Sequence, residues 1–198
     1  MKKGYLGVML DCSRNAVMSV AELKNFILTL KKTGYNCLQL YTEDTYEIEG
    51  EPQFGYRRGK YTKAELKEID AFAKKNGVEV MPCIQTLAHL NQIFRYPKYQ
   101  NINDANDVLL VDDERTYALI EKMIATCAEC FTSRNIHIGM DEAHWLCRGR
   151  YFDLHGASNR FNVLLRHLSR VTEIAEKYGL KPMMWSDMFF CIAGKGEY

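Results

Sequence analysis

Two neighbouring carboxylates, Asp141 and Glu142, follow the apolar segment that begins at His137. Like charges this close disfavour ionisation of both groups, so one of them can keep a proton near neutral pH. An acid and an anion a few ångströms apart are suited to breaking a glycosidic bond. With Ala143 and His144, the same residues also spell D-E-A-H, the acidic box of a helicase. Two different chemistries are therefore compatible with this segment.

The helicase interpretation requires a phosphate-binding loop, G-x-x-x-x-G-K-S/T, ahead of the acidic box. The nearest candidate, residues 55–61, has three residues between its glycines instead of four, and Tyr61 stands where a magnesium-binding hydroxyl is needed. The formal charge of +1, with no long basic run, gives no sign of a phosphate-binding surface. We therefore expect no nucleic-acid partner and interpret the D-E-A-H match as coincidence.

The adjacency of Asp141 and Glu142 limits which glycosidase mechanism they could serve. The common mechanisms use carboxyl groups on opposite faces of the sugar, roughly 5–5.5 Å or 6.5–9.5 Å apart. Neighbours at one strand end act from the same side, which suits substrate-assisted catalysis, where the sugar's own 2-acetamido oxygen is the nucleophile. A purely structural alternative is that the pair caps a helix or binds Arg148 and Arg150.

The remainder of the chain alternates short apolar runs with longer amphipathic ones. Strands are expected at residues 5–11, 36–42, 78–84, 135–139 and 180–186. Helices are expected at residues 20–33, 62–76, 114–131 and 159–178. This alternation predicts an α/β fold of parallel strands with helical crossovers, either a doubly wound open sheet or a (β/α)₈ TIM barrel.

Polar and aromatic residues follow all five predicted strands, at residues 11–14, 41–44, 85–89, 141–145 and 185–187. A ring of βα loops builds one site in this way, whereas an open sheet concentrates its ligand contacts at one switch point. We therefore favour the barrel, which needs eight strands and typically about 250 residues. Residues 1–198 are expected to be part of a catalytic barrel domain, its first five βα units, within a longer protein. The unpaired edges of such a piece favour self-association.

Composition favours a cytoplasmic protein. The chain is 47% hydrophobic and 26% charged, no apolar stretch approaches the roughly 20 residues of a membrane span, and the N-terminus is a poor signal peptide. The seven cysteines lie mostly in apolar segments, which indicates reduced, buried thiols. Cys127 and Cys130 form a C-x-x-C within a helical pattern, without the second pair of a zinc site. We expect no membrane association, no metal and no cofactor.

The segment from His137 to Glu142 resembles the H-x-G-x-D-E signature of the glycoside hydrolase family 20 β-N-acetylhexosaminidases. Further segments resemble that family in the same order along the chain, at residues 7–14, 40–44, 85–89 and 184–187. The combination is most similar to a bacterial subgroup of single-chain, exo-acting enzymes without a secretion signal. Residues 87–88 depart from the family, because Leu-Ala stands there in place of Pro-Gly before the histidine.

The resemblance implies a role for each matching residue. Glu142 would be the general acid and then the base for water, and Asp141 would position the 2-acetamido group for attack, giving an oxazoline. The substrate-binding residues would be those at the other strand ends, namely Arg14 on the 3- and 4-hydroxyls, Asp44 and His89 as a charge-linked set that tunes the acid, and Trp185 against the acetamido methyl. Whether Glu43 or Asp44 faces the site is open, since neighbours point to opposite sides of a strand.

The implied activity is an exo-β-N-acetylhexosaminidase that releases terminal β-linked N-acetylglucosamine from a glycan with retention. Acceptance of N-acetylgalactosamine is left open. One alternative is a non-catalytic carbohydrate-binding barrel, which would keep Arg14 and Trp185 but has no need of both carboxylates. Another is a metal-dependent barrel hydrolase whose ligands would be Asp44, His89, Asp141 and Glu142.

Overall fold

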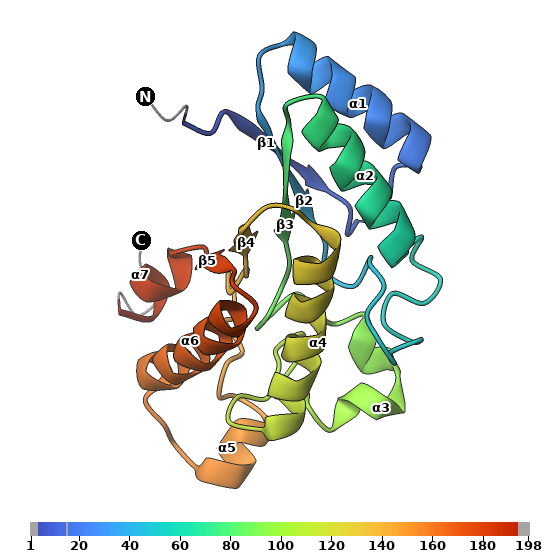
Figure 1. The fold of residues 1–198 in the computed structure, drawn as a ribbon. Helices are drawn as coiled ribbons and strands as arrows, with labels where there is room; N and C mark the ends of the chain where they lie inside the picture. Colours follow the sequence, from blue (N-terminus) through green and yellow to red (C-terminus); the bar gives the residue numbers. More distant parts are fainter. Residues whose placement is uncertain (1–3, 15, 194–198) are drawn as a thin grey trace.

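A curved parallel sheet forms the centre of the molecule (Figure 1). The computed structural model describes residues 4–14 and 16–193, and in them the strands are β1 (Gly7–Asp11), β2 (Cys37–Tyr41), β3 (Glu79–Cys83), β4 (Asn135–His137) and β5 (Lys181–Met183). Their order in the sheet is β1-β2-β3-β4-β5, the order of the chain, and every neighbouring pair is parallel. A doubly wound sheet reverses its order at a switch point. The described strands contain no such reversal, so the barrel prediction is confirmed over the open sheet.

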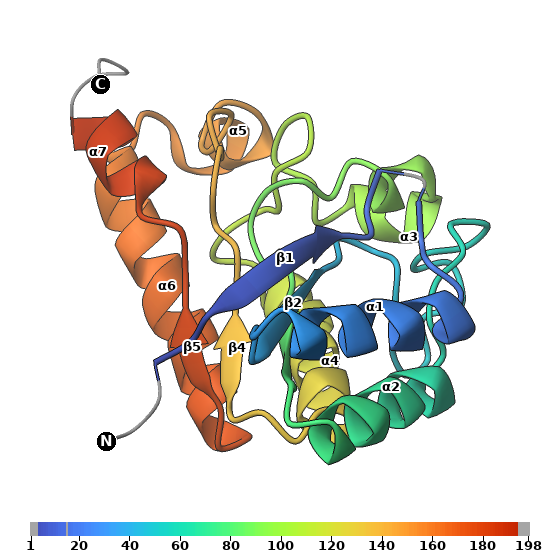
Figure 2. The same cartoon turned by 90° about the horizontal axis from the view of Figure 1, so that it is seen from above.

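Four long helices follow the first four strands and form the outer layer. They are α1 (Val20–Lys32), α2 (Lys63–Lys75), α4 (Glu114–Cys130) and α6 (Arg160–Lys177). Successive helices contact one another, and Figure 2 shows them around the periphery of the sheet. This is the arrangement of the βα units of a (β/α)₈ barrel.

The caps and apolar stripes of these helices agree with the sequence. In α2, Thr62 and Glu65 form the expected capping box, which satisfies backbone N–H groups of the first turn. In α1, Leu23, Ile27 and Leu30 form the buried face that packs toward the sheet, and Ser19 caps the first turn. The predicted boundaries of the long helices lie within one residue of the observed ones.

Short helices interrupt the loops after the strands and were not expected. They are η1 (Ile93–Arg95), α3 (Pro97–Gln100), α5 (Arg150–His155) and α7 (Asp187–Ala193). Each has seven residues or fewer, too short for a 3.6-residue apolar period to be recognised. The seven cysteines are free thiols, and six of them are buried. None of the helices in the described ranges is both long and apolar enough to cross a bilayer.

The sheet curls strongly between β1 and β4. The amide of Asn135, in β4, donates to the hydroxyl of Tyr5, just before β1, at 2.7 Å. Two strands separate β1 from β4 in the sheet order, so this contact requires the closing curvature of a barrel.

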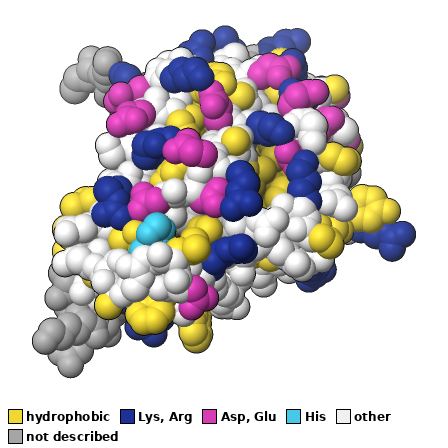
Figure 3. Space-filling view, turned by 90° about the horizontal axis from the view of Figure 1, so that it is seen from below, with side chains coloured by type: hydrophobic (Ala, Val, Ile, Leu, Met, Phe, Trp, Pro, Cys, Tyr) yellow, Lys and Arg dark blue, Asp and Glu magenta, His cyan; other side chains and the backbone are white. Residues whose placement is uncertain are grey.

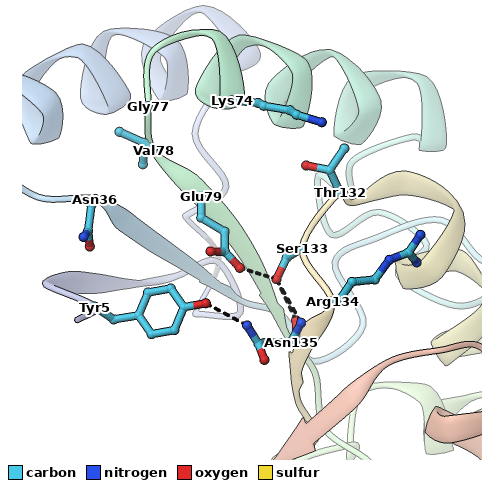
Figure 4. A pocket seen from close by; sticks show the side chains of 10 residues that line it. All are labelled: Tyr5, Asn36, Lys74, Gly77, Val78, Glu79, Thr132, Ser133, Arg134 and Asn135. Atoms are coloured by element: carbon cyan, nitrogen blue, oxygen red, sulfur yellow. Dashed lines mark hydrogen bonds between the residues drawn. The ribbon is translucent and has the colours of Figure 1, made fainter. Parts of the chain in front are cut away.

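A polar pocket of about 740 Å³ lies at the N-terminal ends of the strands, beside this contact (Figure 4). Its polar side chains bind one another, since Ser133 donates to Glu79 at 2.6 Å. In barrels this end serves stability, and ligands bind at the opposite end.

The outer strands have one unpaired edge each within the described residues. β1 pairs with β2, and β5 pairs with β4. Exposed apolar side chains, among them Leu6 and Met183, lie at or next to these edges. Elsewhere the surface is of mixed charge, and Figure 3 shows Lys or Arg interspersed with Asp or Glu on the face it presents.

Candidate active site

The loops after the strands bring His89 between the two adjacent carboxylates. Its Nε2 lies 3.2 Å from Oδ2 of Asp141 and 3.7 Å from Oε2 of Glu142. The close contact with the Asp141 carboxylate raises the pKa of His89 against the opposing effect of burial. His89 thus joins the adjacent pair Asp141 and Glu142, about fifty residues further along the chain, in one cluster of ionisable side chains at the C-terminal end of the sheet.

Asp141 is held from two sides and carries a negative charge. The amide Nε2 of Gln85 donates to its Oδ1 at 2.8 Å, while His89 contacts its other oxygen. Burial favours the neutral acid, but the contact with His89 and the hydrogen bond from Gln85 lower the pKa of Asp141 below its ordinary value. The same Gln85 amide also donates to the hydroxyl of Tyr41, at 2.9 Å. Asp141 is therefore a fixed negative charge.

Glu142, by contrast, has a side chain that is 66% exposed. It lines a pocket of about 460 Å³ together with Asp141, His144, Trp185, Ser186 and Asp187. Its backbone has φ of 49° and its N–H donates to Oδ2 of Asp187 at 3.0 Å. Both carboxylates line this pocket. Asp141 lies against the protein interior, and the exposed carboxylate of Glu142 is accessible to a ligand.

Gly139 allows this turn to pack against the loop after β3. It has φ of 74°, and a Cβ at this position would lie 2.1 Å from Oε1 of Gln85 and 2.8 Å from the carbonyl oxygen of Ile84. A left-handed backbone favours glycine, and so close an approach leaves no room for a Cβ. The glycine of the H-x-G-x-D-E motif is thus explained by its contact with the residue that holds Asp141.

Trp185 forms one side of the pocket and packs against the buried ring of His137. Their ring centroids are 4.7 Å apart, and the indole is 40% exposed. Nδ1 of His137 accepts the N–H of Gly139 at 3.1 Å, and burial lowers the pKa of His137, so the ring is neutral. Trp185 therefore presents an apolar surface to the pocket, as a group that binds an acetamido methyl would need.

Arg14 joins the site through its neighbours on β1 and β2. Its Nη1 lies 3.2 Å from Asp11 and 3.3 Å from Glu43, and the guanidinium lies 5.5 Å from the ring centroid of Tyr41. The arginine side chain is more than half exposed, so donors remain available to a ligand. Its position agrees with a hydroxyl-binding role, which stays a prediction.

Asp44 does not form the expected set with His89. It is buried against Arg58, whose Nε lies 3.2 Å from Oδ1. Glu43 faces the site instead: it accepts from Tyr41 at 3.3 Å, and its charge contributes to the raised pKa of His89. Neighbouring side chains of an extended chain point to opposite sides, so the two acids lie in different surroundings. A metal site that includes Asp44 is not assembled by this geometry.

The loop that carries His89 has a carboxylate support that the sequence did not reveal. Asp107 accepts the backbone N–H of His89 at 3.1 Å, and its Oδ2 is also 4.0 Å from Nδ1 of the ring. His89 has φ of 60°. Leu87 and Ala88 stand where the family has Pro-Gly, and the structure accommodates them with both side chains fully buried. Gln85, Asp107 and Asp187 were all missed as site residues, and only their positions after strands could have indicated the first and the last.

His167, in α6, supports the same loop from behind and should make stability pH-dependent. Its Nε2 donates to the carbonyl of Thr86 at 2.8 Å, and burial lowers its pKa from 6.5 to about 4. Because the unfolded chain then binds the proton more readily, this stabilisation is complete above about pH 6.5 and is lost as the pH falls toward 4. The difference amounts to about 3 kcal/mol.

We expect His167→Gln to flatten the decline of unfolding free energy between pH 6.5 and pH 4, as measured by urea titrations at several pH values. His155→Gln, at an exposed position on α5, is the control and should keep the wild-type slope. An unchanged slope in His167→Gln would contradict this assignment.

Comparison with known proteins finds similarity to one family of glycosyl hydrolases. The family model described as Glycosyl hydrolase family 20, catalytic domain, matches residues 4–193. Hexosaminidase D of Bos taurus is 25% identical over 184 residues, which are 88% of this chain and 53% of that protein. The β-hexosaminidase of Vibrio furnissii is 26% identical over 175 residues, covering 70% of this chain and 28% of that protein.

Solved structures agree in fold. The family 20 β-N-acetylhexosaminidase of Streptomyces coelicolor superposes with a TM-score of 0.78 at 25% identity, over 94% of this chain and 40% of that one. The N-acetyl-β-hexosaminidase of Streptomyces plicatus, solved with Thio-NAglucal, superposes with a TM-score of 0.77 at 26% identity, with the same coverage of 94% and 40%. This chain thus spans about half, or less, of the length of the relatives it matches.

Proposed function

The chain belongs to glycosyl hydrolase family 20, and from this premise we propose that it contributes the catalytic residues of an exo-β-N-acetylhexosaminidase. The substrate would be a glycan with a terminal β-linked N-acetylglucosamine, cleaved with retention by its own acetamido group. The cytoplasmic location expected from the sequence remains part of this proposal.

One observation carries the proposal: a half-buried, ionised Asp141 lies beside an exposed Glu142 in the lining of one pocket. Two such carboxylates cannot attack from opposite faces of a sugar. A fixed anion can, however, accept a hydrogen bond from an acetamide N–H and stabilise the positive charge that develops on its nitrogen. Trp185 then offers the apolar surface for the methyl group.

The reaction follows from these positions. The acetamide oxygen forms a bond to C1 while the C1–O bond of the aglycone breaks, and Glu142 gives its proton to the departing oxygen. Asp141 holds the acetamide N–H throughout. In the second step Glu142 takes a proton from water, whose oxygen attacks C1 and restores the acetamide. Two displacements at C1 leave its configuration unchanged.

The test compares an aryl β-N-acetylglucosaminide with the matching aryl β-glucoside, using the longest polypeptide that contains residues 1–198. We expect cleavage of the first substrate alone, because the glucoside lacks the nucleophile. Equal cleavage of both would show that the protein supplies its own nucleophile, and cleavage of neither would favour the carbohydrate-binding alternative.

The isolated 198-residue chain is expected to be inactive and to self-associate or to unfold more readily than the longer protein. The unpaired edges of β1 and β5 expose backbone groups that another copy can bind. Analytical ultracentrifugation over a range of concentrations, together with the aryl assay, measures both properties. A stable monomer with full turnover would contradict this prediction.

A further inference from the structure

We propose that Asp187 is a positioning residue that fixes the general acid Glu142 through its backbone. The proposal rests on the function assigned above, and it adds a residue that acts on the acid from the next strand. The evidence is the way in which the loop after β5 is bound to the loop after β4.

Two hydrogen bonds join these loops. Oδ2 of Asp187 accepts the N–H of Glu142 at 3.0 Å, and the N–H of Trp185 donates to the carbonyl of Gly139 at 3.1 Å. The first bond is made at the residue whose carboxylate must reach the substrate. The wall of the pocket and the acid are therefore set relative to each other by backbone contacts on both sides of Asp141.

Glu142 needs such a restraint because its other backbone bond is local, from the N–H of His144 to its carbonyl at 2.6 Å. Its φ of 49° lies in the left-handed region, which is unfavourable for residues other than glycine. Its exposed carboxylate has one ion contact among the described residues, with His89 at 3.7 Å. Without the bond to Asp187, rotation of this backbone unit would move the carboxylate away from the glycosidic oxygen.

The hydrogen bond that the Asp187 carboxylate accepts comes from outside its own helix. Asp187 is the first residue of α7, where an acidic side chain commonly stabilises the positive end of the helix dipole. Its bonded oxygen goes to Glu142 instead, and Oδ1 is buried without a hydrogen-bond partner in the described part of the chain. A buried, half-satisfied carboxylate is costly for folding alone, which favours a function for the bond that it does make.

Leaving-group dependence separates a positioning role from a structural one. A 2,4-dinitrophenyl group departs as a stable anion and needs little help from an acid, whereas a phenyl group needs the proton. Two aryl β-N-acetylglucosaminides that differ in this respect bind alike but depend differently on Glu142. Misplacing a catalytic group by about 1 Å can cost about a hundredfold.

The experiment measures kcat/KM for both substrates in the longest polypeptide that contains the chain. Asp187→Ala is expected to lower the phenyl rate at least about tenfold and the dinitrophenyl rate less than about threefold. Asp187→Asn keeps an acceptor oxygen and should recover most of the phenyl rate. Asp153→Ala, which removes an exposed carboxylate on α5, is the matched control and should leave both rates unchanged.

Each outcome decides the matter. Equal losses on both substrates in Asp187→Ala, or no rescue by asparagine, would assign Asp187 a structural role and overturn the inference. An unchanged phenyl rate would overturn it as well. Failure of the proposed function is separately visible, because the wild-type protein would then cleave neither glycoside.

Discussion

Glu142→Gln is expected to lower the hydrolysis of an aryl β-N-acetylglucosaminide at least about a hundredfold, the lower end of what a positioned general acid contributes. Glutamine keeps the size of the side chain but cannot give a proton to the departing oxygen. Since the carboxylate is 66% exposed and lines the pocket, the change should leave the fold intact. Steady-state kcat/KM measured with the phenyl glycoside tests this.

Glu176→Gln, at an exposed position on α6, is the matched control and should retain wild-type activity. Circular dichroism melts of both variants would exclude a folding defect. A loss of less than about threefold in Glu142→Gln would remove this residue from the role of acid and would require another donor at the pocket.

Gly139→Ala is expected to lower the free energy of unfolding by about 2–5 kcal/mol, from the left-handed backbone and from overpacking together. The new Cβ would lie 2.1 Å from Oε1 of Gln85 and 2.8 Å from a backbone oxygen that cannot move freely. Because Gln85 donates to Asp141 at 2.8 Å, its displacement should also reduce activity in whatever protein remains folded. Urea unfolding and the aryl assay measure the two effects.

The control Gly77→Ala separates the cost of the left-handed backbone from the cost of overpacking. Gly77 has φ of 76°, close to the 74° of Gly139, but a Cβ there would meet nothing within 4 Å. Gly77→Ala should lower the free energy of unfolding only by the cost of a left-handed backbone, about 1–2 kcal/mol, and should leave activity normal. Equal destabilisation by the two substitutions would show that the contact with Gln85 is unimportant.

The long helices and the strand order were predictable because their causes are local. Thr62 and Glu65 form a capping box within four residues of each other, and the stripe of Leu23, Ile27 and Leu30 follows the helical period. Alternation of such helices with apolar strands limits the topology to parallel sheets. The short helix α3 has no such period, and it follows from packing in the loop after β3.

The site was predictable in part, and the comparison of Asp44 with Glu43 shows where local information ends. Both are acids at the end of β2, and both are buried. Only the twist and closure of the sheet decide that Glu43 points toward His89 and that Asp44 points toward Arg58. Gln85 was likewise visible as a strand-end residue, yet its bond to Asp141 joins positions 56 residues apart.

The sequence by itself determined the parallel βα architecture, the presence of Asp141 and Glu142 at a strand end, and the family, because these depend on residue type, period and order along the chain. The tertiary structure alone decided which acid faces inward, that Asp141 is the fixed anion, and that Asp187 binds the backbone of Glu142. Such contacts are set by the curvature of the sheet, which brings the ends of successive strands together and has no local pattern in the sequence.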